Sequence, residues 1–413
     1  MKRVIGMSWV RLGVLSFVVF LALLLAGTVA AQGPLADSYM PVTVRGAELP
    51  GLLGAPTASL WVYANPGGAL VQIPVQIDQI VSGVYSGAPA TTLAEEDEIF
   101  FMAADMGTLV TPAEIATTLP ISATWYQIVV TDAYSPTLKA YAYVVQSDAV
   151  TPTTTSYVFF DEGNQMIEAV AYDLGLLAGH PGFDYLALNG SGVDLLDRTK
   201  IRISAFGGMF KQTENDLAEP AANVLANGPV RAIIQGGGTI AYRSMVQTVL
   251  VESMAGVDAV RLSTDFAAAA AGSTLYNANV NAGVTVDGAA DVVPIAESVW
   301  WQLSGSTGTL VQAVDATQVG GTQSTYYKDD ATVDLADTGD QMSYGDIGLM
   351  VNSPNASVVY RQALVVLPPN LPNMGLLVAA GADPARLLVA TAIQSAPPEY
   401  PNVVYLPLVI KGE

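Results

Sequence analysis

Positive charge is concentrated in one stretch of this sequence, which holds seven of its 16 Lys and Arg residues: Arg198, Lys200, Arg202, Lys211, Arg231, Arg243 and Arg261. The segment DLLDRTKIRISAFGG alternates polar and apolar residues, and side chains two positions apart on a strand share a face. Arg198, Lys200 and Arg202 are therefore expected on one face, while Ile201 and Ile203 point the other way. Strand pairing would bring Arg231 or Arg243 beside the three cations. Such a stripe would attract an acidic polysaccharide, because arginine binds carboxylates through paired hydrogen bonds.

Acidic residues close to these cations give them a second interpretation. The nearest are Asp194, Asp197, Glu214 and Asp216. If they pair with the cations, the stripe is a solvated face of a sheet carrying ion pairs, and not a binding site.

The only histidine, His180, is the one side chain whose ordinary pKa suits acid–base catalysis near neutral pH. An enzyme that uses an imidazole as its general acid or base would need partners for it. The candidate companions are Glu214, Tyr242 and Arg243, with Arg202 or Arg231 to bind a sugar carboxylate. The alternative is a loop histidine, flanked by Gly and Pro, whose ring is satisfied by backbone groups.

A run of aspartates indicates a candidate calcium site, because Ca²⁺ takes six to eight oxygen ligands from flexible loops. The candidate ligands are Asp329, Asp330, Asp334, Asp337 and Asp340. The run lacks the ligand spacing of an EF-hand, and a solvated acidic loop is the alternative.

Two adjacent tryptophans are candidates for stacking on a sugar ring. Trp300 and Trp301 lie in a predicted strand, where neighbours face opposite sides, so only one of them can face the core. The other lies either at the surface, as a ligand platform, or under a second layer.

Charge and composition exclude several classes of protein. The formal charge of −21 repels nucleic acid, and the absence of cysteine excludes disulfides, thiolate metal sites and a cysteine nucleophile. The chain has 413 residues, of which 51% are hydrophobic, so it can stabilise itself with a large core.

Both ends of the chain carry features of an exported protein. Lys2 and Arg3 precede an apolar run and then small residues, which is the order of a secretory signal peptide cut after Ala31. An uncleaved membrane anchor is the alternative. The Pro-rich tail, residues 396–413, resembles "YLPLV" tails of bacterial secreted proteins and predicts either attachment to the cell envelope or an edge strand. We expect a secreted or cell-surface protein.

Short alternating segments separated by Gly- and Pro-containing turns predict an all-β fold, a large and mostly antiparallel β-sandwich. The sandwich is expected to span residues 32–395, with a sub-boundary near 150–156. A short helix is predicted at 165–178, where the strand pattern is weakest.

The order of three motifs, and the strands predicted after them, resembles a known group of proteins. IPVQID, DEIFFMAADMG and NGPVRAII are followed by many predicted antiparallel strands. This order is similar to secreted galactose mutarotase-like and polysaccharide-lyase-like "super-sandwich" proteins, over roughly residues 40–395. The resemblance implies a twisted antiparallel sandwich that acts on or binds carbohydrate.

Three functions follow as hypotheses from these observations. The first is a carbohydrate-binding protein, with acidic polysaccharide as one ligand class. The second is a structural or adhesive cell-envelope protein without a small ligand, and the third is a lyase or epimerase-like enzyme that uses His180. The oligomeric state is not encoded in these patterns.

Overall fold

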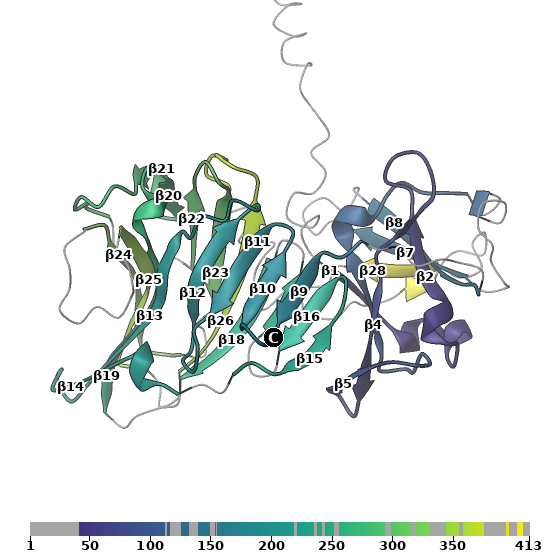
Figure 1. Cartoon of the computed structure of the whole chain (residues 1–413), viewed down its shortest axis with the longest axis horizontal. Coiled ribbons are helices and arrows are strands. Elements are labelled where there is room, and N and C mark those ends of the chain that lie inside the picture. Colours follow the sequence, from purple (N-terminus) through teal and green to yellow (C-terminus); the bar gives the residue numbers. More distant parts are fainter. Residues whose placement is uncertain are drawn as a thin grey trace, which may run out of the picture. The chain divides into compact units, whose positions relative to one another are not determined.

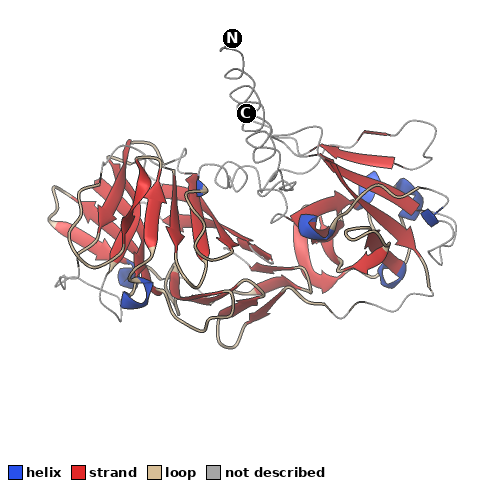
Figure 2. Cartoon of the chain, turned by 90° about the horizontal axis from the view of Figure 1, so that it is seen from above, coloured by secondary structure: helices blue, strands red, loops and turns tan. Residues whose placement is uncertain are grey.

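The computed structural model describes residues 41–111, 114–115, 125–131, 139–148, 153, 155–218, 221–234, 238–241, 244–251, 256–293, 299–315, 319–330, 344–354, 358–375, 394–395 and 403–407. Strands dominate this part of the chain (Figures 1 and 2). Its 3-10 helices are short: η1 (Gly46–Glu48), η2 (Pro50–Leu52), η3 (Thr57–Ser59), η4 (Ala103–Asp105), η5 (Glu214–Asp216) and η6 (Ala268–Ala270). No helix among the described residues is long and apolar enough to cross a membrane.

The first part of the chain forms two sheets. Sheet I has the order β1 (Pro41–Arg45), β6 (Glu98–Met102), β4 (Gln76–Val81), β5 (Val84–Pro89). Sheet II has the order β27 (Gln394–Ser395), β28 (Val403–Pro407), β7 (Trp125–Thr131), β8 (Lys139–Gln146), β2 (Leu60–Ala64), β3 (Val71–Ile73). Strand β28, from the C-terminal tail, runs parallel to β7. The attachment role of the tail stays a prediction.

The next strands form sheets III and IV. Sheet III has the order β12 (Phe183–Leu188), β11 (Tyr172–Leu176), β10 (Met166–Ala169), β9 (Val158–Asp161). Sheet IV has the order β14 (Phe210–Thr213), β13 (Leu196–Ala205), β19 (Val257–Phe266), β25 (Gly345–Asn352), β24 (Thr322–Lys328). The two sheets adjoin at the turn between β12 and β13, where the Leu195 N–H donates to the Leu186 carbonyl over 2.9 Å.

Sheet V is the largest, with nine strands. Its order is β15 (Val224–Asn227), β16 (Arg231–Ile234), β17 (Gly238–Ala241), β18 (Ser244–Val251), β26 (Val358–Leu367), β23 (Thr309–Asp315), β22 (Trp300–Ser304), β20 (Thr274–Asn277), β21 (Val280–Thr285). All its pairings are antiparallel, as are those of sheets III and IV.

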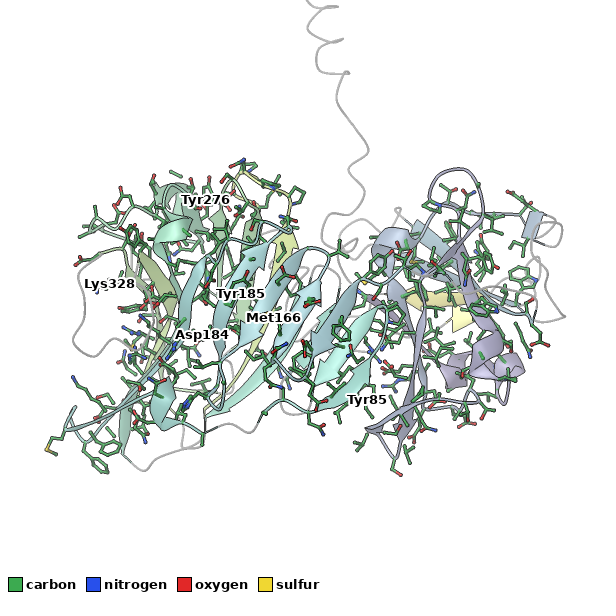
Figure 3. The ribbon with its side chains drawn as sticks, viewed as in Figure 1. Tyr85, Met166, Asp184, Tyr185, Tyr276 and Lys328 are labelled. Atoms are coloured by element: carbon green, nitrogen blue, oxygen red, sulfur yellow. The ribbon has the colours of Figure 1, made fainter. Side chains whose placement is uncertain are left out.

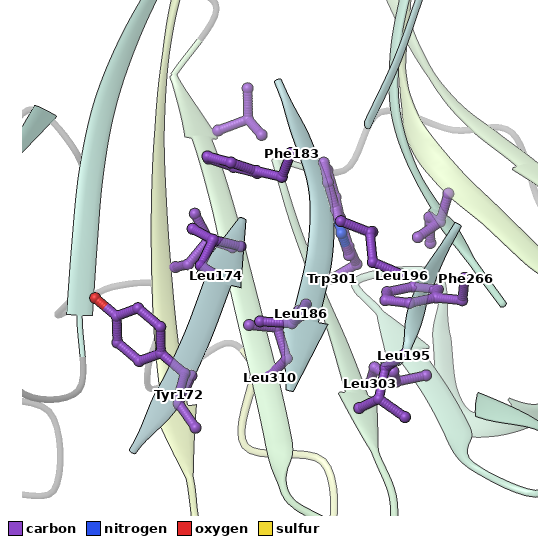
Figure 4. Close-up of a cluster of buried hydrophobic side chains, with 14 of the residues drawn as sticks. Tyr172, Leu174, Phe183, Leu186, Leu195, Leu196, Phe266, Trp301, Leu303 and Leu310 are labelled. Atoms are coloured by element: carbon purple, nitrogen blue, oxygen red, sulfur yellow. The ribbon is translucent and has the colours of Figure 1, made fainter. Parts of the chain in front are cut away.

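The main hydrophobic core lies between sheet V and the layer made by sheets III and IV. Leu174 and Leu186, from sheet III, lie near Leu310 and Trp301 of sheet V in this core (Figure 4). Ile201 joins the same core from sheet IV and is fully buried. The predicted all-β sandwich is therefore confirmed.

A second core lies between sheets I and II. It is formed by alternate residues such as Val44 of β1, Ile99 of β6, Val62 of β2 and Ile128 of β7. Its members lie between residues 42 and 144, whereas those of the main core lie between 158 and 366. Residues 150–156 lie between these two ranges, and the sub-boundary there stays a prediction.

The helix predicted at 165–178 is wrong, because this segment forms β10 and β11 with a two-residue connection. Ile167 and Leu174 stand opposite each other and are both buried in the main core. Burial of one alternating face against sheet V outweighs local helix propensity, which amounts to only tenths of a kcal/mol per residue, about 0.7 at most for ordinary residues.

Candidate functional site

The predicted basic stripe lies on the face of sheet IV that points away from the main core. Ile201 and Ile203 are 0% and 4% exposed in the core, as the alternation predicts, so Lys200 and Arg202 point to the opposite side. The register continues this polar face onto β19, where Ser263 stands opposite Lys200 and Arg261 opposite Arg202.

Lys200 is held between two carboxylates. Its Nζ lies 3.0 Å from the Asp197 carboxylate and also pairs with that of Asp265. Asp197 reaches this face because the β13–β19 register shifts between Leu196 and Arg198, which interrupts the normal alternation. All three side chains are almost completely buried, so the two carboxylates depend on the Lys200 charge and Lys200 depends on them.

The neighbouring cations are also paired. Arg202 binds the buried Glu214, and the Arg198 Nε lies 2.9 Å from Asp184 Oδ1. The pairing interpretation of the stripe therefore describes these side chains, and the partner of Arg198, Asp184, is not among the acidic residues named from the sequence. A polysaccharide carboxylate would have to displace a carboxylate of the protein from each of them.

Arg261 completes the polar face from β19. Its NH2 group lies 3.6 Å from Asp346 Oδ2, and its guanidinium carbon lies 4.2 Å from the centre of the Tyr326 ring. Burial raises the pKa of Asp346, and the nearby cations Arg261 and Lys200 oppose that rise. Burial, with the Asp346 charge, also raises the pKa of Tyr326, to about 12.

Arg231, one of the two arginines proposed to join this stripe, does not lie beside it. It belongs to β16 of sheet V, where it pairs with Ala241, while β13 pairs with β14 and β19. Its Nε lies 2.6 Å from Asp78 Oδ2 and its NH2 group 2.8 Å from Glu98 Oε2, both on sheet I. Arg243 lies outside the described residues.

His180 and Glu214 have different partners. The His180 Nδ1 lies 2.9 Å from the Leu217 carbonyl oxygen, so a backbone group satisfies the ring, as the loop alternative predicts. Glu214 Oε2 accepts the Ile201 N–H over 2.9 Å and also binds Arg202. Tyr242, the third member of the predicted catalytic set, lies outside the described residues.

The two tryptophans are both buried. Trp301 lies in the main core, and Trp300 lies on the opposite face of β22 with an exposed fraction of 3%. Residues 371–375 cover that face: Gln302 Nε2 donates to the Pro372 carbonyl over 3.0 Å, and Gly375 contacts the Trp300 ring. Trp300 therefore lies under a second layer and offers no ligand platform.

Asp329 has a local structural role. Its Oδ1 accepts the Gly288 N–H over 2.7 Å and its Oδ2 accepts the Asp287 N–H over 3.1 Å. In the described part of the chain, no group of three or more His, Cys, Asp or Glu residues is placed to hold a metal ion. Asp330 is described, whereas Asp334, Asp337 and Asp340 lie outside the described residues.

A different surface, the outer face of sheet III, combines aromatic side chains with carboxylates. One cross-strand row runs from Tyr185 through Gly175 to Met166, and the next contains Asp173, Glu168 and Phe159. Phe159 is 51% exposed, and Glu168 is exposed as well. Figure 3 labels Tyr185 and Met166 on this sheet.

Two carboxylates on this face oppose each other directly. Glu168 of β10 pairs in register with Asp173 of β11, an arrangement that costs up to about 1 kcal/mol for like charges. Partial burial raises the pKa of Asp173, and burial with the Asp173 and Asp194 charges raises that of Tyr185. Sequence reasoning missed this face because it assigned a helix there, although the period-two pattern of Met166, Ile167 and Glu168 was present.

Comparison with known proteins supplies no assignment, since the chain matches no family model and no curated protein.

Proposed function

We propose that this chain is a secreted or cell-surface carbohydrate-binding protein, and that the outer face of sheet III binds a neutral glycan. The supporting observation is the row of Asp173, Glu168 and Phe159 beside Tyr185 on the face of sheet III that points away from the main core. Secretion rests on the basic and apolar leader of the sequence.

The chemistry of sugars fits these side chains. The C–H groups on one face of a pyranose ring are apolar and stack on aromatic rings, while its hydroxyls donate hydrogen bonds to carboxylates. Gly175 has no side chain and is buried between Tyr185 and the end of the Met166 side chain, so the row is closely packed. Repulsion between the opposed carboxylates of Asp173 and Glu168 destabilises the free protein. Sugar hydroxyls that donate hydrogen bonds to both carboxylates would reduce this repulsion.

Charge favours a neutral ligand over an acidic one. Asp161, Glu168 and Asp173 all lie on this face, so a polyuronate would be repelled. The cations predicted to hold uronates already have carboxylate partners, which would have to be displaced. Neutral plant or microbial glycans are therefore the class to test first.

The experiment is isothermal titration with neutral β-linked glucan, xylan and mannan oligosaccharides, and with polygalacturonate as the acidic comparison, each with and without calcium. Tyr185→Ala should weaken binding of a neutral oligosaccharide at least tenfold, whereas Tyr185→Phe should retain most of it. Val292→Ala, at a residue that is 99% exposed and far in sequence, is the control. Binding of polygalacturonate alone, or equal binding by Tyr185→Ala and the control, would refute the proposal.

A further inference from the structure

The hairpin between β13 and β14 exposes a cluster of large apolar side chains at its tip, which we call the hairpin tip: residues 206–210. Met209 is 86% exposed, Phe206 54% and Phe210 44%. Figure 1 shows β14 at the end of sheet IV. Single exposed apolar residues are ordinary, whereas three within five residues of one turn form a candidate interaction site.

The backbone of the hairpin tip is fixed by neighbouring strands. The Phe206 N–H donates to the Gly256 carbonyl over 3.0 Å, and the Asp258 carboxylate accepts the N–H groups of Gly207 and Gly208 over 2.6 and 3.3 Å. Phe206 has φ of +55°, which is uncommon for an aromatic residue and costs about 1–3 kcal/mol. The chain thus keeps a costly conformation at a residue whose ring is half exposed.

The hairpin tip carries no acidic side chain of its own. Residues 203–213 contain no Asp or Glu in a chain with a formal charge of −21, and Lys211 directly follows the tip. Asp258, which lies against the tip, directs its carboxylate to the two glycine N–H groups. The hairpin tip itself therefore adds no negative charge that would repel a phosphate-bearing layer.

We propose that the hairpin tip inserts into the interfacial region of a lipid bilayer. A protruding tip supplies side chains and does not receive a ligand, and a bilayer interface accepts apolar side chains without a matching pocket. Phe206, Met209 and Phe210 would enter the acyl boundary, and Lys211 would meet the phosphate groups. With one cation only, binding needs no anionic lipid.

The experiment measures insertion at the tip itself, since the apolar leader of the full chain also meets lipid. The Met209→Trp variant is mixed with phosphatidylcholine vesicles that carry bromine on the acyl chains, which quenches tryptophan within the bilayer. Val292→Trp and the unmodified chain, which share the leader and its Trp9, are the controls. Quenching of Met209→Trp should exceed that of both controls at least twofold.

A second variant separates insertion from protein association. The Met209→Ser, Phe210→Ser double variant should reduce vesicle binding relative to Val81→Ser, Val84→Ser, which alters the exposed tip of the β4–β5 hairpin. Quenching of Met209→Trp no greater than that of Val292→Trp would overturn the proposal. A second contrary outcome is self-association of the unmodified chain in sedimentation, without any quenching by lipid. In that case the Met209→Ser, Phe210→Ser variant alone would abolish the self-association.

Discussion

The guanidinium carbon of Arg231 lies 4.0 Å from the centre of the Phe100 ring. Phe100 belongs to β6 of sheet I and Arg231 to β16 of sheet V, so this cation joins the two parts of the described chain that have separate cores. Asp78 and Glu98 neutralise it, and Gln76 Oε1 accepts its backbone N–H over 2.9 Å. Arg231 is 3% exposed, and almost all of its charge is therefore compensated by these partners.

Replacement of this arginine should destabilise the protein strongly. Arg231→Met leaves the buried Asp78 without this cation and leaves Glu98 only the exposed Arg45, whose Nε lies 4.0 Å from Glu98 Oε1. Loss of one member of a buried ion pair costs about 3–5 kcal/mol. The measurement is the free energy of unfolding in urea. The triple variant Arg231→Met, Asp78→Asn, Glu98→Gln removes the whole set of charges and should recover part of the loss. An Arg231→Met chain as stable as one carrying Lys211→Ala, an exposed position, would contradict this account.

Lys200 allows a second test, in the main sandwich, of the cost of removing a cation from a buried ion pair. Lys200→Met leaves Asp197 and Asp265 facing each other in a buried site, so the free energy of unfolding should fall by about 3–5 kcal/mol. The Lys200→Met, Asp197→Asn, Asp265→Asn variant should be more stable than Lys200→Met alone. If the single variant is the more stable of the two, Lys200 does not compensate these carboxylates.

The part of the fold that follows from period-two alternation was predictable. Burial of Ile201 and Ile203, and the placement of Trp300 and Trp301 on opposite faces, depend only on which residues neighbour each other along a strand. The same pattern was overlooked at Ile167, where a short segment without strong β-branched content resembled a helix. Because this segment was assigned to a helix, the outer face of sheet III was not predicted either.

The partners of the charged residues could not be predicted from local sequence patterns. Arg231 binds Asp78 across 153 residues of chain, and no feature near either residue indicates which strands pair. Asp197 shares a face with Lys200 only because of a register shift in β13. Such register shifts are set by packing between strands that are distant in the sequence. A single sequence therefore does not distinguish an exposed stripe of cations from cations that pair with carboxylates of the same protein.

The cover over Trp300 gives a prediction that needs no ligand. A Cβ atom at Gly375 would collide with the Trp300 ring, so Gly375→Ala should displace residues 371–375 and admit water to the indole. Tryptophan emission should shift to longer wavelength and acrylamide quenching should increase. Gly67→Ala is the matched control, since a Cβ there meets no atom within 4 Å. Unchanged emission in Gly375→Ala would show that this segment does not cover the ring.

Glu48 should make stability depend on pH in the neutral range. Burial, with a smaller contribution from the Glu98 charge, raises the pKa of Glu48 from 4.5 to about 7, although the Arg45 backbone N–H and charge oppose the rise. The folded chain therefore holds this proton more tightly than the unfolded chain, so the free energy of unfolding falls as pH rises from about 4.5 to 7. After allowance for solvent screening of this partly exposed group, the loss is about 1 kcal/mol.

Glu48→Gln, which cannot ionise, should remove this part of the pH dependence. The variant should gain stability relative to the unmodified chain as pH rises through the window, measured by urea unfolding at pH 5, 6, 7 and 8. Glu162→Gln, an exposed position, is the control and should follow the unmodified chain. A constant difference between Glu48→Gln and the unmodified chain from pH 5 to 8 would mean that Glu48 titrates at its ordinary pKa, because only a difference in proton affinity between the folded and unfolded states produces a slope.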